Sequence, residues 1–431
     1  MSGVTVTPSL ALTTFSSTTG GARGMAIPLM SLRSASTTDV DTVAQLMGAL
    51  ERLDTAGSVE YFDGTVQLIG DSDPVWQIRF RTEAAQSLPL NEFALGQAYV
   101  EGEIDLDGDL VALLEVRSAL RKGITVRDAV AFAYRLMLRS PTKVNAASIA
   151  KHYTLGNDFY LSFIDRRYRY YSHCLFHHDQ ETLEEAAEHK LESMWNALDL
   201  KPGMRLLDIG GGWGGTTQFC GNRGVEVTSL TLVEESAAYI RRLIAGQGIP
   251  GKVIVQDILD HRPAEPYDHA VIYGVIEHIP NYRTFCERVW SALKPGGRLY
   301  LDASATKQKF AVSPFTRQFT WPGHHSFFSL QDMARELLFH GFEIVEIERE
   351  THDYELTIRH WADRFEANHE FVAQRWGEDV YRAFRMFLRG GQHAFQTNRL
   401  QAYHLVAERR PDPGPRPGAL IRAADFFGSL R

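Results

Sequence analysis

The stretch MRLLDIGGGWGG at 204–215 decides the fold, because an apolar strand runs into a cluster of glycines and a helical stretch follows. Glycine permits a tight turn and lets the backbone approach a ligand with no Cβ in between. We expect Gly210, Gly212 and Gly214 to do this, with Asp208 beside them as a further ligand-binding candidate. Taken alone the motif is ambiguous, since Gly210, Gly212 and Gly215 also satisfy the GxGxxG pattern of dinucleotide-binding proteins.

The next two strands separate these possibilities. The strand VEVTSLTL at 225–232 ends at Thr231 and Leu232. It lacks the ribose-binding acid that a nicotinamide site places about 20 residues after the glycines. A third strand ends in Gln256 and Asp257, where a carboxylate can accept a hydrogen bond from an adenine amino group.

Two further strands complete the pattern, YDHAVIYGVIEHI at 267–279 and, after a turn, LKPGGRLYLD at 293–302. The succession resembles the class I methyltransferase fold, a Rossmann-like, doubly wound α/β sheet. It implies S-adenosylmethionine as the cofactor and makes a dehydrogenase the less favoured alternative.

Composition changes along the chain indicate its domain organisation. Ser, Thr and Gly dominate the N-terminus, whereas VDTVAQLMGALERL, SVEYFDGTVQLIG and PVWQIRFR have the periods of one helix followed by strands. We predict a mobile leader at 1–38, a small N-terminal α+β domain at 39–125, a linker helix at 126–150, the methyltransferase domain at 151–410 and a flexible tail at 411–431.

Two segments of these regions each have two interpretations. The linker VRDAVAFAYRLMLR is amphipathic, so it either packs on protein, which we favour, or lies on anionic lipid. DLDGD at 105–109 superficially suggests a calcium loop, but Val116 stands where such a loop needs its bidentate Glu. We expect a polar turn there.

Bulk composition excludes several classes of protein. With 431 residues, 44% hydrophobic and 23% charged, the chain fits a globular protein with two cores. No stretch approaches the ~18 uninterrupted apolar residues of a transmembrane helix, and no signal peptide is recognisable, so we expect a cytoplasmic location. Three cysteines suggest reduced thiols, and a net charge of −8 argues against nucleic acid as a partner. Membrane contact would have to depend on local basic patches.

Four further segments carry a resemblance to a family. They are HYTLGNDFYLSFIDRRYRYYSHCLF at 152–176, VIEHIPNY at 275–282, WPGHHS at 321–326 and DYELTIRHWADRFEAN at 353–368. They resemble the cyclopropane fatty acid synthases and the related mycolic acid cyclopropane synthases. The resemblance covers roughly residues 40 to 410, including the small N-terminal domain that the phospholipid-acting members carry.

The resemblance implies a function and a set of cofactor contacts. It implies a methyltransferase that alkylates the double bond of an unsaturated fatty acyl chain within a phospholipid, through transient contact at the inner membrane surface. It also implies that the cofactor is contacted by Tyr171, Ser172, Gly210, Gly212, Thr231, Leu232, Asp257 and Ile258.

Methyl transfer to an alkene leaves a carbocation, so a base must accept a proton. In the family this base is a bicarbonate ion held by a Glu, a His, a Tyr and backbone around a Cys and an Ile. Glu277 and Tyr354 match, but His173 replaces the Cys, Asp302 the His and Ser304 the Ile. Bicarbonate beside two carboxylates would be repelled. We therefore expect Glu277, with Asp302 and His173, to accept the proton, and bicarbonate stays open.

The same departures bear on the product, for which we favour a methylene branch over a cyclopropane ring. Aromatic faces could stabilise the cation, although most of the nearby rings suit the core or an acyl channel. These rings belong to Tyr153, Phe159, Tyr160, Tyr170, Phe319 and Trp321.

Other functions and partners follow less directly from the sequence. His173, Cys174, His177, His178 and Asp179 are rich in ligand atoms, but their spacing matches no zinc pattern, so we expect no metal. The alternatives are methylation of another apolar alkene, such as a polyketide or terpenoid, and a non-catalytic lipid-binding protein. A homo-oligomer and a partner reductase for a methylene product stay open.

Overall fold

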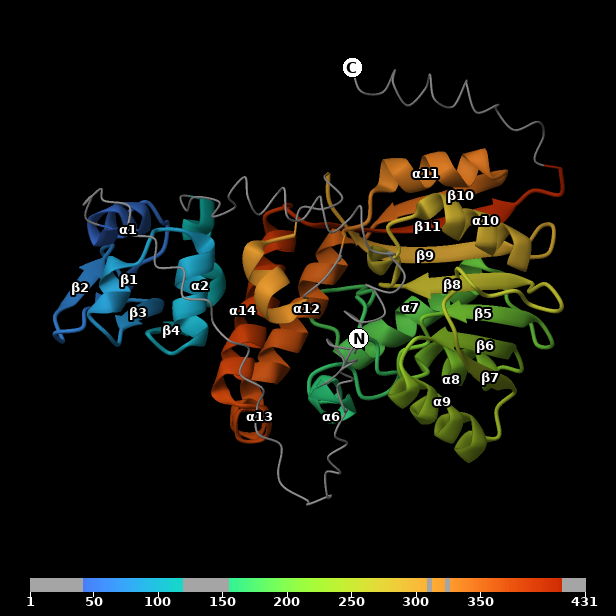
Figure 1. The fold of residues 1–431 in the computed structure, drawn as a ribbon, viewed down its shortest axis with the longest axis horizontal. Helices are drawn as coiled ribbons and strands as arrows, with labels where there is room; N and C mark the ends of the chain where they lie inside the picture. The colour runs from blue at the N-terminus through green and yellow to red at the C-terminus, as the bar shows by residue number, and fades with distance from the viewer. Residues whose placement is uncertain (1–41, 119–154, 308–311, 322–325, 413–431) are drawn as a thin grey trace, which may run out of the picture. The chain divides into compact units, whose positions relative to one another are not determined.

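The computed structural model describes residues 42–118, 155–307, 312–321 and 326–412 (Figure 1). The predicted leader, the linker helix and the tail beyond residue 412 lie outside these residues, and the domain boundaries stay predictions. The described residues all belong to one compact unit.

A seven-stranded sheet forms the larger part of the fold, with the strand order β10-β11-β9-β8-β5-β6-β7. Its strands are β5 (Arg205–Ile209), β6 (Glu226–Thr231), β7 (Gly251–Val255), β8 (His269–Tyr273), β9 (Arg298–Ala305), β10 (Phe342–Arg349) and β11 (Gln401–Arg409). Strands β5 to β9 pair in parallel, as the sequence predicts, and β11 lies antiparallel between β9 and β10. The predicted class I methyltransferase fold is confirmed.

Helices cover both faces of this sheet, because successive strand residues point to opposite sides. Leu206 packs into the core on one side, and Leu207 packs into the core on the other. The first core includes residues of α7 (Leu183–Ala197), α8 (Gly215–Gly221), α12 (Thr351–Ala367), α13 (His369–Trp376) and α14 (Glu378–Gln396). The second includes residues of α10 (Tyr282–Ala292) and α11 (Leu330–Phe339). Helix α9 (Glu234–Gln247) connects β6 to β7.

The N-terminal segment has its own four-stranded sheet and hydrophobic core. Its elements are α1 (Thr42–Leu50), β1 (Gly57–Glu60), β2 (Val66–Ile69), β3 (Trp76–Phe80), α2 (Glu92–Val100), β4 (Ile104–Gly108) and α3 (Leu110–Leu114). The predicted polar turn at 105–109 is wrong. Residues 105–108 belong to β4, where Asp105 pairs with Arg382, and Asp109 caps α3 by accepting hydrogen bonds from the backbone of Val111 and Ala112.

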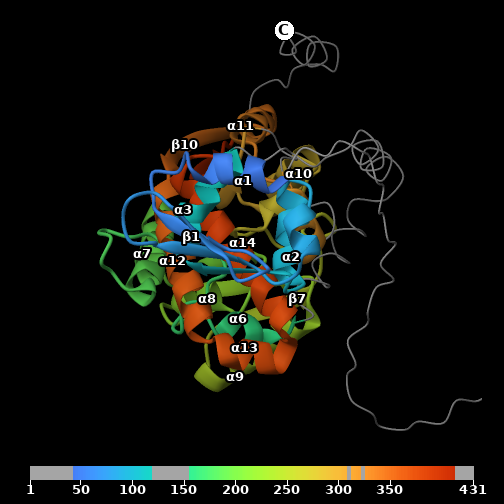
Figure 2. The same cartoon turned by 90° about the vertical axis from the view of Figure 1, so that its left-hand side faces the viewer.

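Helix α14 contacts α2 and α3 of this segment and α12 of the larger part (Figure 2). Arg382 binds Asp105 at 2.8 Å, and Arg385 donates to the Leu106 carbonyl at 2.7 Å and to the Tyr99 hydroxyl at 3.1 Å. Because these arginines are largely buried, the contacts fix α14 against β4 and α2.

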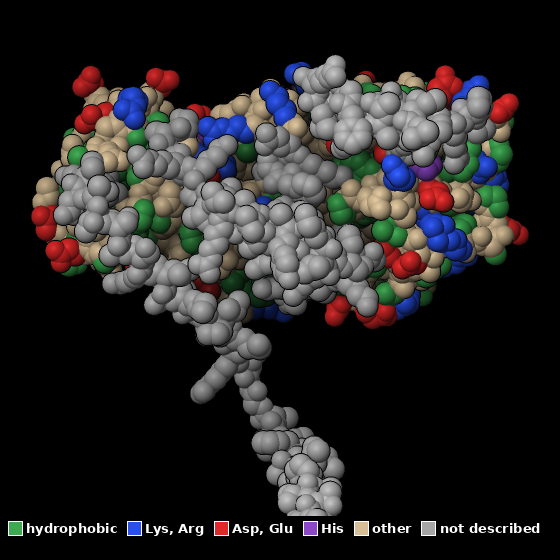
Figure 3. Space-filling model, turned by 45° about the horizontal axis from the view of Figure 1, so that its top comes forward, with side chains coloured by type: hydrophobic (Ala, Val, Ile, Leu, Met, Phe, Trp, Pro, Cys, Tyr) green, Lys and Arg blue, Asp and Glu red, His purple; other side chains and the backbone are tan. Residues whose placement is uncertain are grey.

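The surface carries mixed charge, and acidic and basic side chains are interspersed over the described part of the face in Figure 3. Cys174, Cys220 and Cys286 are buried and unpaired. Within the described ranges, no helix combines the length and apolar character needed to cross a membrane.

Candidate active site

One large cavity opens at the carboxyl ends of the parallel strands, where β6 and β8 flank β5 and open α/β sheets bind ligands. Its volume is about 1220 Å³, larger than the roughly 300–1,000 Å³ of a site for one small molecule. It has room for two ligands. Among the predicted site residues, those that line it are Tyr171, Ser172, Asp208, Gly210, Gly212, Thr231, Leu232, Gln256, Asp257, Ile258, Glu277 and Tyr354.

The glycine loop after β5 forms one wall of the cavity. Gly210, Gly212 and Gly214 have φ angles of 91°, 50° and 78°, a conformation that favours glycine. A Cβ on Gly212 would meet no described atom nearer than the Gly210 carbonyl oxygen at 4.0 Å, so the space beside it is open. A Cβ on Gly210 would lie 2.4 Å from the Val275 side chain. Gly210 therefore serves packing as well as the cavity.

Gly214 does not line the cavity, which corrects its predicted role in approaching a ligand. It is the residue before α8, and a Cβ there would come within 2.8 Å of Leu243 on α9. Gly214 thus allows the close packing of two helices, which is another known use of glycine in this type of loop.

Asp208, at the end of β5, is buried beneath the glycine loop. It accepts a hydrogen bond from the Ser229 hydroxyl at 2.8 Å, and burial raises its pKa to about 7. Beside it, the hydroxyls of Tyr170 and Thr216 are 2.6 Å apart. These hydrogen-bonded side chains form a buried polar cluster that supports the glycine loop.

The predicted adenine end lies after β6 and β7. Thr231 is the last residue of β6 and Leu232 follows it, and Gln256, Asp257 and Ile258 follow β7. Asp257 accepts from the Leu259 backbone N–H at 2.9 Å, and burial raises the pKa of its carboxyl. The side chains that the sequence assigned to one ligand thus come together, although their role in binding it stays a prediction.

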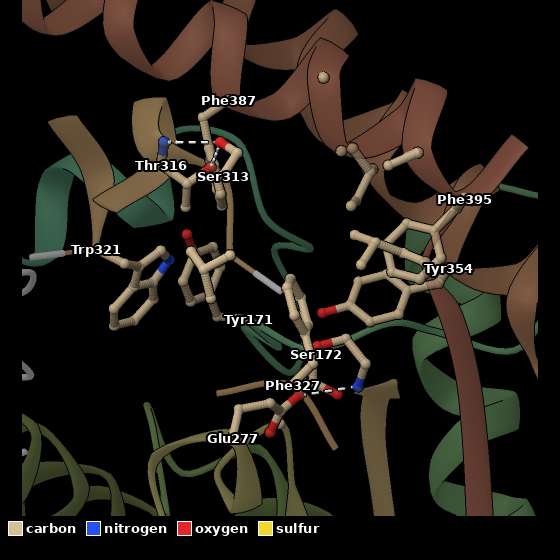
Figure 4. A pocket seen from close by; sticks show the side chains of 18 of the residues that line it. Tyr171, Ser172, Glu277, Ser313, Thr316, Trp321, Phe327, Tyr354, Phe387 and Phe395 are labelled. Carbon is tan, nitrogen blue, oxygen red and sulfur yellow. Dashed lines mark hydrogen bonds between the residues drawn. The ribbon is translucent and has the colours of Figure 1, made fainter. Parts of the chain in front are cut away.

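Glu277 occupies the loop after β8 and is buried at the cavity (Figure 4). Its Oε1 accepts hydrogen bonds from the backbone N–H and the hydroxyl of Ser304, at 2.9 and 2.8 Å. Its Oε2 is buried with no hydrogen-bond partner among the described residues. Burial raises the pKa of Glu277 to about 7. One oxygen is therefore fixed by Ser304, while the other has no partner within the described residues.

Tyr354, from α12, faces the same space, and in Figure 4 its hydroxyl points toward the centre of the cavity. Its ring stacks between two others, with centroids 4.3 Å from Phe395 and 4.7 Å from His173. Burial raises the pKa of the Tyr354 phenol. The hydroxyl therefore stays protonated and can donate a hydrogen bond.

Asp302 lies behind this wall, in an ion pair that the sequence analysis missed. Lys190, on α7, contacts Asp302 and donates to the Ser172 hydroxyl at 2.8 Å. Asp302 also accepts from the backbone N–H of Gly274 at 3.0 Å. The premise that Asp302 adds an uncompensated anion beside Glu277 is wrong, because a buried lysine balances its charge. Asp302 is not among the described residues that line the cavity.

His173 is likewise turned away from the cavity. One ring nitrogen lies 2.6 Å from a carboxylate oxygen of Glu350, whose other oxygen is 2.5 Å from His404. Burial alone would raise the pKa of Glu350, but the charges and hydrogen bonds of His173 and His404 outweigh it and lower the pKa. His173 thus supports the Tyr354 ring, and its predicted proton-accepting role does not fit this position.

Lys190 could have been found from periodicity. Residues 183, 186, 187, 190, 191 and 194 form the buried stripe of α7, so a lysine at 190 falls on an apolar helical face. A lysine is rarely buried without a partner. Glu350 offered no such signal, because its two imidazole partners come from segments distant in the sequence.

The candidate aromatic rings divide into two groups. Tyr170 and Trp321 line the cavity, whereas Phe159 and Tyr160 are fully buried in the adjacent core. Phe319 packs against Phe315 with the two rings tilted by 40°, and it does not line the described cavity, while Tyr153 lies outside the described residues.

The predicted ligand-rich cluster is rearranged by the fold. His177 and His178 gather around the buried Glu181 together with His189, whose ring stacks on His177 at 3.7 Å. Cys174 packs into the core, and Asp179 pairs with His352. Metal binding by this cluster stays untested.

The family model for mycolic acid cyclopropane synthetase matches residues 140–405, more than half of the chain. The chain belongs to this family. The resemblance inferred from the sequence motifs is thereby confirmed, and the chain is an S-adenosylmethionine-dependent methyltransferase.

Individual relatives extend the match into the N-terminal segment. A probable fatty acid methyltransferase of Pseudomonas putida is 27% identical over 381 residues, covering 85% of this chain and 95% of the relative. The cyclopropane-fatty-acyl-phospholipid synthase of Escherichia coli K12 is 28% identical over 330 residues, covering 75% and 84%. The cyclopropane synthase MmaA2 from Mycobacterium tuberculosis shares the fold, with a TM-score of 0.57, 23% identity and coverage of 63% and 99%.

The cavity fits the cofactor that the family uses. The open space beside Gly212 accommodates a ligand against bare backbone, and the carboxylates of Asp208, Asp257 and Glu277 suit a cationic sulfonium compound. Tyr171 and Ser172 close the cavity from the segment that precedes α7.

Replacing Gly212 with valine should abolish S-adenosylmethionine binding while the protein stays folded. The side chain would fill the open space, and the φ of 50° should cost about 1–2 kcal/mol of stability. Calorimetric titration with S-adenosylmethionine measures the effect. Gly64→Val is the matched control, since Gly64 has a φ of 84° and open space but lies in the N-terminal hairpin. Undiminished affinity in Gly212→Val would contradict this placement of the cofactor.

Proposed function

We propose that this protein methylates the double bond of an unsaturated fatty acyl chain carried by a phospholipid, with Glu277 as the group that accepts the proton. One observation carries the proposal: a buried carboxylate at the cofactor cavity has one oxygen fixed by Ser304 and the other without a partner in the described residues. The largely apolar remainder of the cavity suits an acyl chain.

The residues of the cavity have two tasks before any bond changes. An alkene is a weak nucleophile, so it must be held in line with the methyl group, and water must be excluded. S-adenosylmethionine, when bound, supplies an electrophilic methyl group on a cationic sulfur. The stacked Tyr354 and Phe395 rings restrict the acyl chain from the α12 and α14 side, while the Gly212 loop fixes the cofactor side.

After the π electrons form the new carbon–carbon bond, the adjacent carbon is cationic and a proton must leave. If the C–H electrons of the transferred methyl close onto that carbon, a cyclopropane ring forms. If a hydride first moves from the methylated carbon to its cationic neighbour, loss of a methyl proton gives a methylene branch. Both routes deliver a proton to the same place, within reach of Oε2 of Glu277. The hydride shift, not the position of the base alone, therefore separates the products.

Asp302 and His173 act as positioning residues in this proposal. Lys190 and Asp302 hold Ser172, and the His173 ring supports Tyr354, so both act through neighbours that line the cavity. Bicarbonate is not needed when Glu277 itself accepts the proton. In this proposal the base is a side chain of the protein, not a bound bicarbonate ion.

A phospholipid substrate requires contact with a membrane surface, which we place at the inner face of the cytoplasmic membrane. The cavity extends along α2 and α3 of the N-terminal segment, where Leu95, Leu110 and Leu113 line it. On the same segment, Phe62 and Leu68 are large apolar side chains exposed to solvent. Such side chains favour transient insertion between lipids. A methylene product would require a separate reductase for saturation.

Vesicles of dioleoyl phospholipid should incorporate label from methyl-labelled S-adenosylmethionine, whereas distearoyl vesicles should not. A saturated chain has no π electrons to attack the methyl group. Mass spectrometry of the released fatty acids measures the incorporation, and sedimentation of the same vesicles with the protein measures membrane contact. Equal labelling of both lipids would refute the alkene chemistry, and absence of labelling with a bound cofactor would refute the function.

A further inference from the structure

Helix α14 presents a regular stripe of residues to the cavity, at the spacing of one helical face. The stripe comprises Met386, Phe387, Gly390, Gly391, Ala394 and Phe395. Large side chains stand at its two ends, and two consecutive glycines stand between them. Because neither glycine has a positive φ, both have ordinary helical conformation. The conformation of the backbone therefore does not require glycine at either position.

The two glycines differ in what surrounds them. A Cβ on Gly391 would lie 3.2 Å from the Ile358 side chain of α12, so a close helix–helix contact explains this glycine. A Cβ on Gly390 would meet no atom of the described residues within 4 Å. Glycine inside a helix is less stable than alanine at the same place. Neither packing nor conformation thus accounts for Gly390, and the space it leaves belongs to the cavity.

The helix around Gly390 is held firmly, so the gap cannot close by a small shift. Arg389 binds Asp363 and Glu366 of α12, at 2.7 and 2.9 Å. One turn later, Gln392 donates to Glu355 at 3.1 Å. Gly390 precedes Phe395 by five residues, which is about 1.4 turns of helix or about 7.5 Å along its axis, and the Phe395 ring stacks on Tyr354. Both Gly390 and Phe395 line the cavity, so the gap belongs to the same cavity as the proposed chemistry.

We propose that the gap at Gly390 is a subsite for the acyl chain, and that Gly390 determines which position of the double bond reaches Glu277. This inference rests on the proposed function. How far an acyl chain advances along the cavity decides which of its carbons lie beside Glu277. The chain has no polar groups to fix this position, so the shape of the wall near the reacting carbons must fix it. Because Gly390 has no side chain, the acyl chain has room at this point of the wall. A side chain in the gap would shift the acyl chain or exclude it.

Gly390→Leu and Gly390→Ala test the subsite, with Gly246→Leu as the matched control. Gly246 also lies in a helix with open space around it, but on the exposed side of α9 and outside the cavity. The substrates are vesicles of oleoyl and of cis-vaccenoyl phospholipid, whose chains have equal length and differently placed double bonds. The readouts are kcat/KM for each lipid, S-adenosylmethionine affinity by calorimetry, and the melting temperature.

We expect Gly390→Leu to lower kcat/KM for oleoyl lipid by about tenfold or more and to change the ratio between the two lipids. Gly390→Ala should show a smaller change in the same direction. Cofactor affinity and melting temperature should stay at the wild-type level or rise, and Gly246→Leu should match the wild type in kcat/KM. Unchanged kcat/KM and ratio in Gly390→Leu would overturn the subsite, as would a lowered melting temperature in Gly390→Ala. Failure of the wild type on both lipids would instead refute the proposed function.

Discussion

Glu277→Gln should lower turnover on unsaturated phospholipid by about 10²–10⁴-fold, the usual effect of losing a general base. The amide keeps the size of the side chain and can still accept the hydrogen bonds from Ser304, but it cannot take a proton. S-adenosylmethionine binding should persist. Single-turnover kinetics with methyl-labelled cofactor, together with calorimetry, measures both quantities.

The pH profile gives a second test of the same group. Burial raises the pKa of Glu277 to about 7, so the carboxylate needed for proton acceptance forms only as the pH rises through that value. Wild-type kcat/KM should rise with pH through an acid limb near 7, and Glu277→Gln should lack this limb. Removal of bicarbonate from the buffer should change little. Strong bicarbonate dependence in the wild type with near-normal turnover in Glu277→Gln would defeat the proposal.

Lys190→Met should destabilise the fold by about 3–5 kcal/mol, the range for leaving one member of a buried ion pair without its partner. Methionine has a similar length but leaves Asp302 as an uncompensated anion in a fully buried position. It also removes the donor that holds the Ser172 hydroxyl, so cofactor affinity should fall as well. The free energy of unfolding from urea titration measures the first effect.

The double variant Lys190→Met with Asp302→Asn provides the control. Removing the stranded negative charge should recover most of the lost stability, because a neutral amide can still accept from the Gly274 backbone. If Lys190→Met is as stable as the wild type, or if the double variant is no more stable than the single one, the ion pair does not carry the stabilisation assigned to it.

The parallel part of the large sheet, strands β5 to β9, was predictable because each of these strands has an apolar run and a turn signal of its own. The glycine loop, Thr231, Gln256 and Glu277 all lie at or just after strand ends, and the rule that open sheets bind ligands there places them together. The position of β11 was not predictable in this way. Its pairing with β9 and β10 depends on contacts between segments far apart in the chain, which no local period records.

The site was predicted less well where a charge depends on a distant partner. Asp302 was interpreted beside Glu277 alone, whereas Lys190 on α7 balances it. His173 was interpreted as facing the substrate, but Glu350 turns its ring into the wall. Gly214 was assigned to the ligand although α9 explains it. In each case the missing information was a side chain from another element, and only the packed structure supplies it.

The place of β11 has a consequence for biosynthesis. Strand β9 carries Ser304, and β11 covers the free edge of β9 with the register Ala305 to Gln401. During translation, the ribosome must therefore deliver residues 401–409 before that edge is paired, and unpaired strand edges are prone to aggregate. At one stage of synthesis, Glu277 and Ser304 have therefore been made while the edge of β9 beside them is still unpaired. We expect a chaperone to be most useful to the nascent chain during this interval.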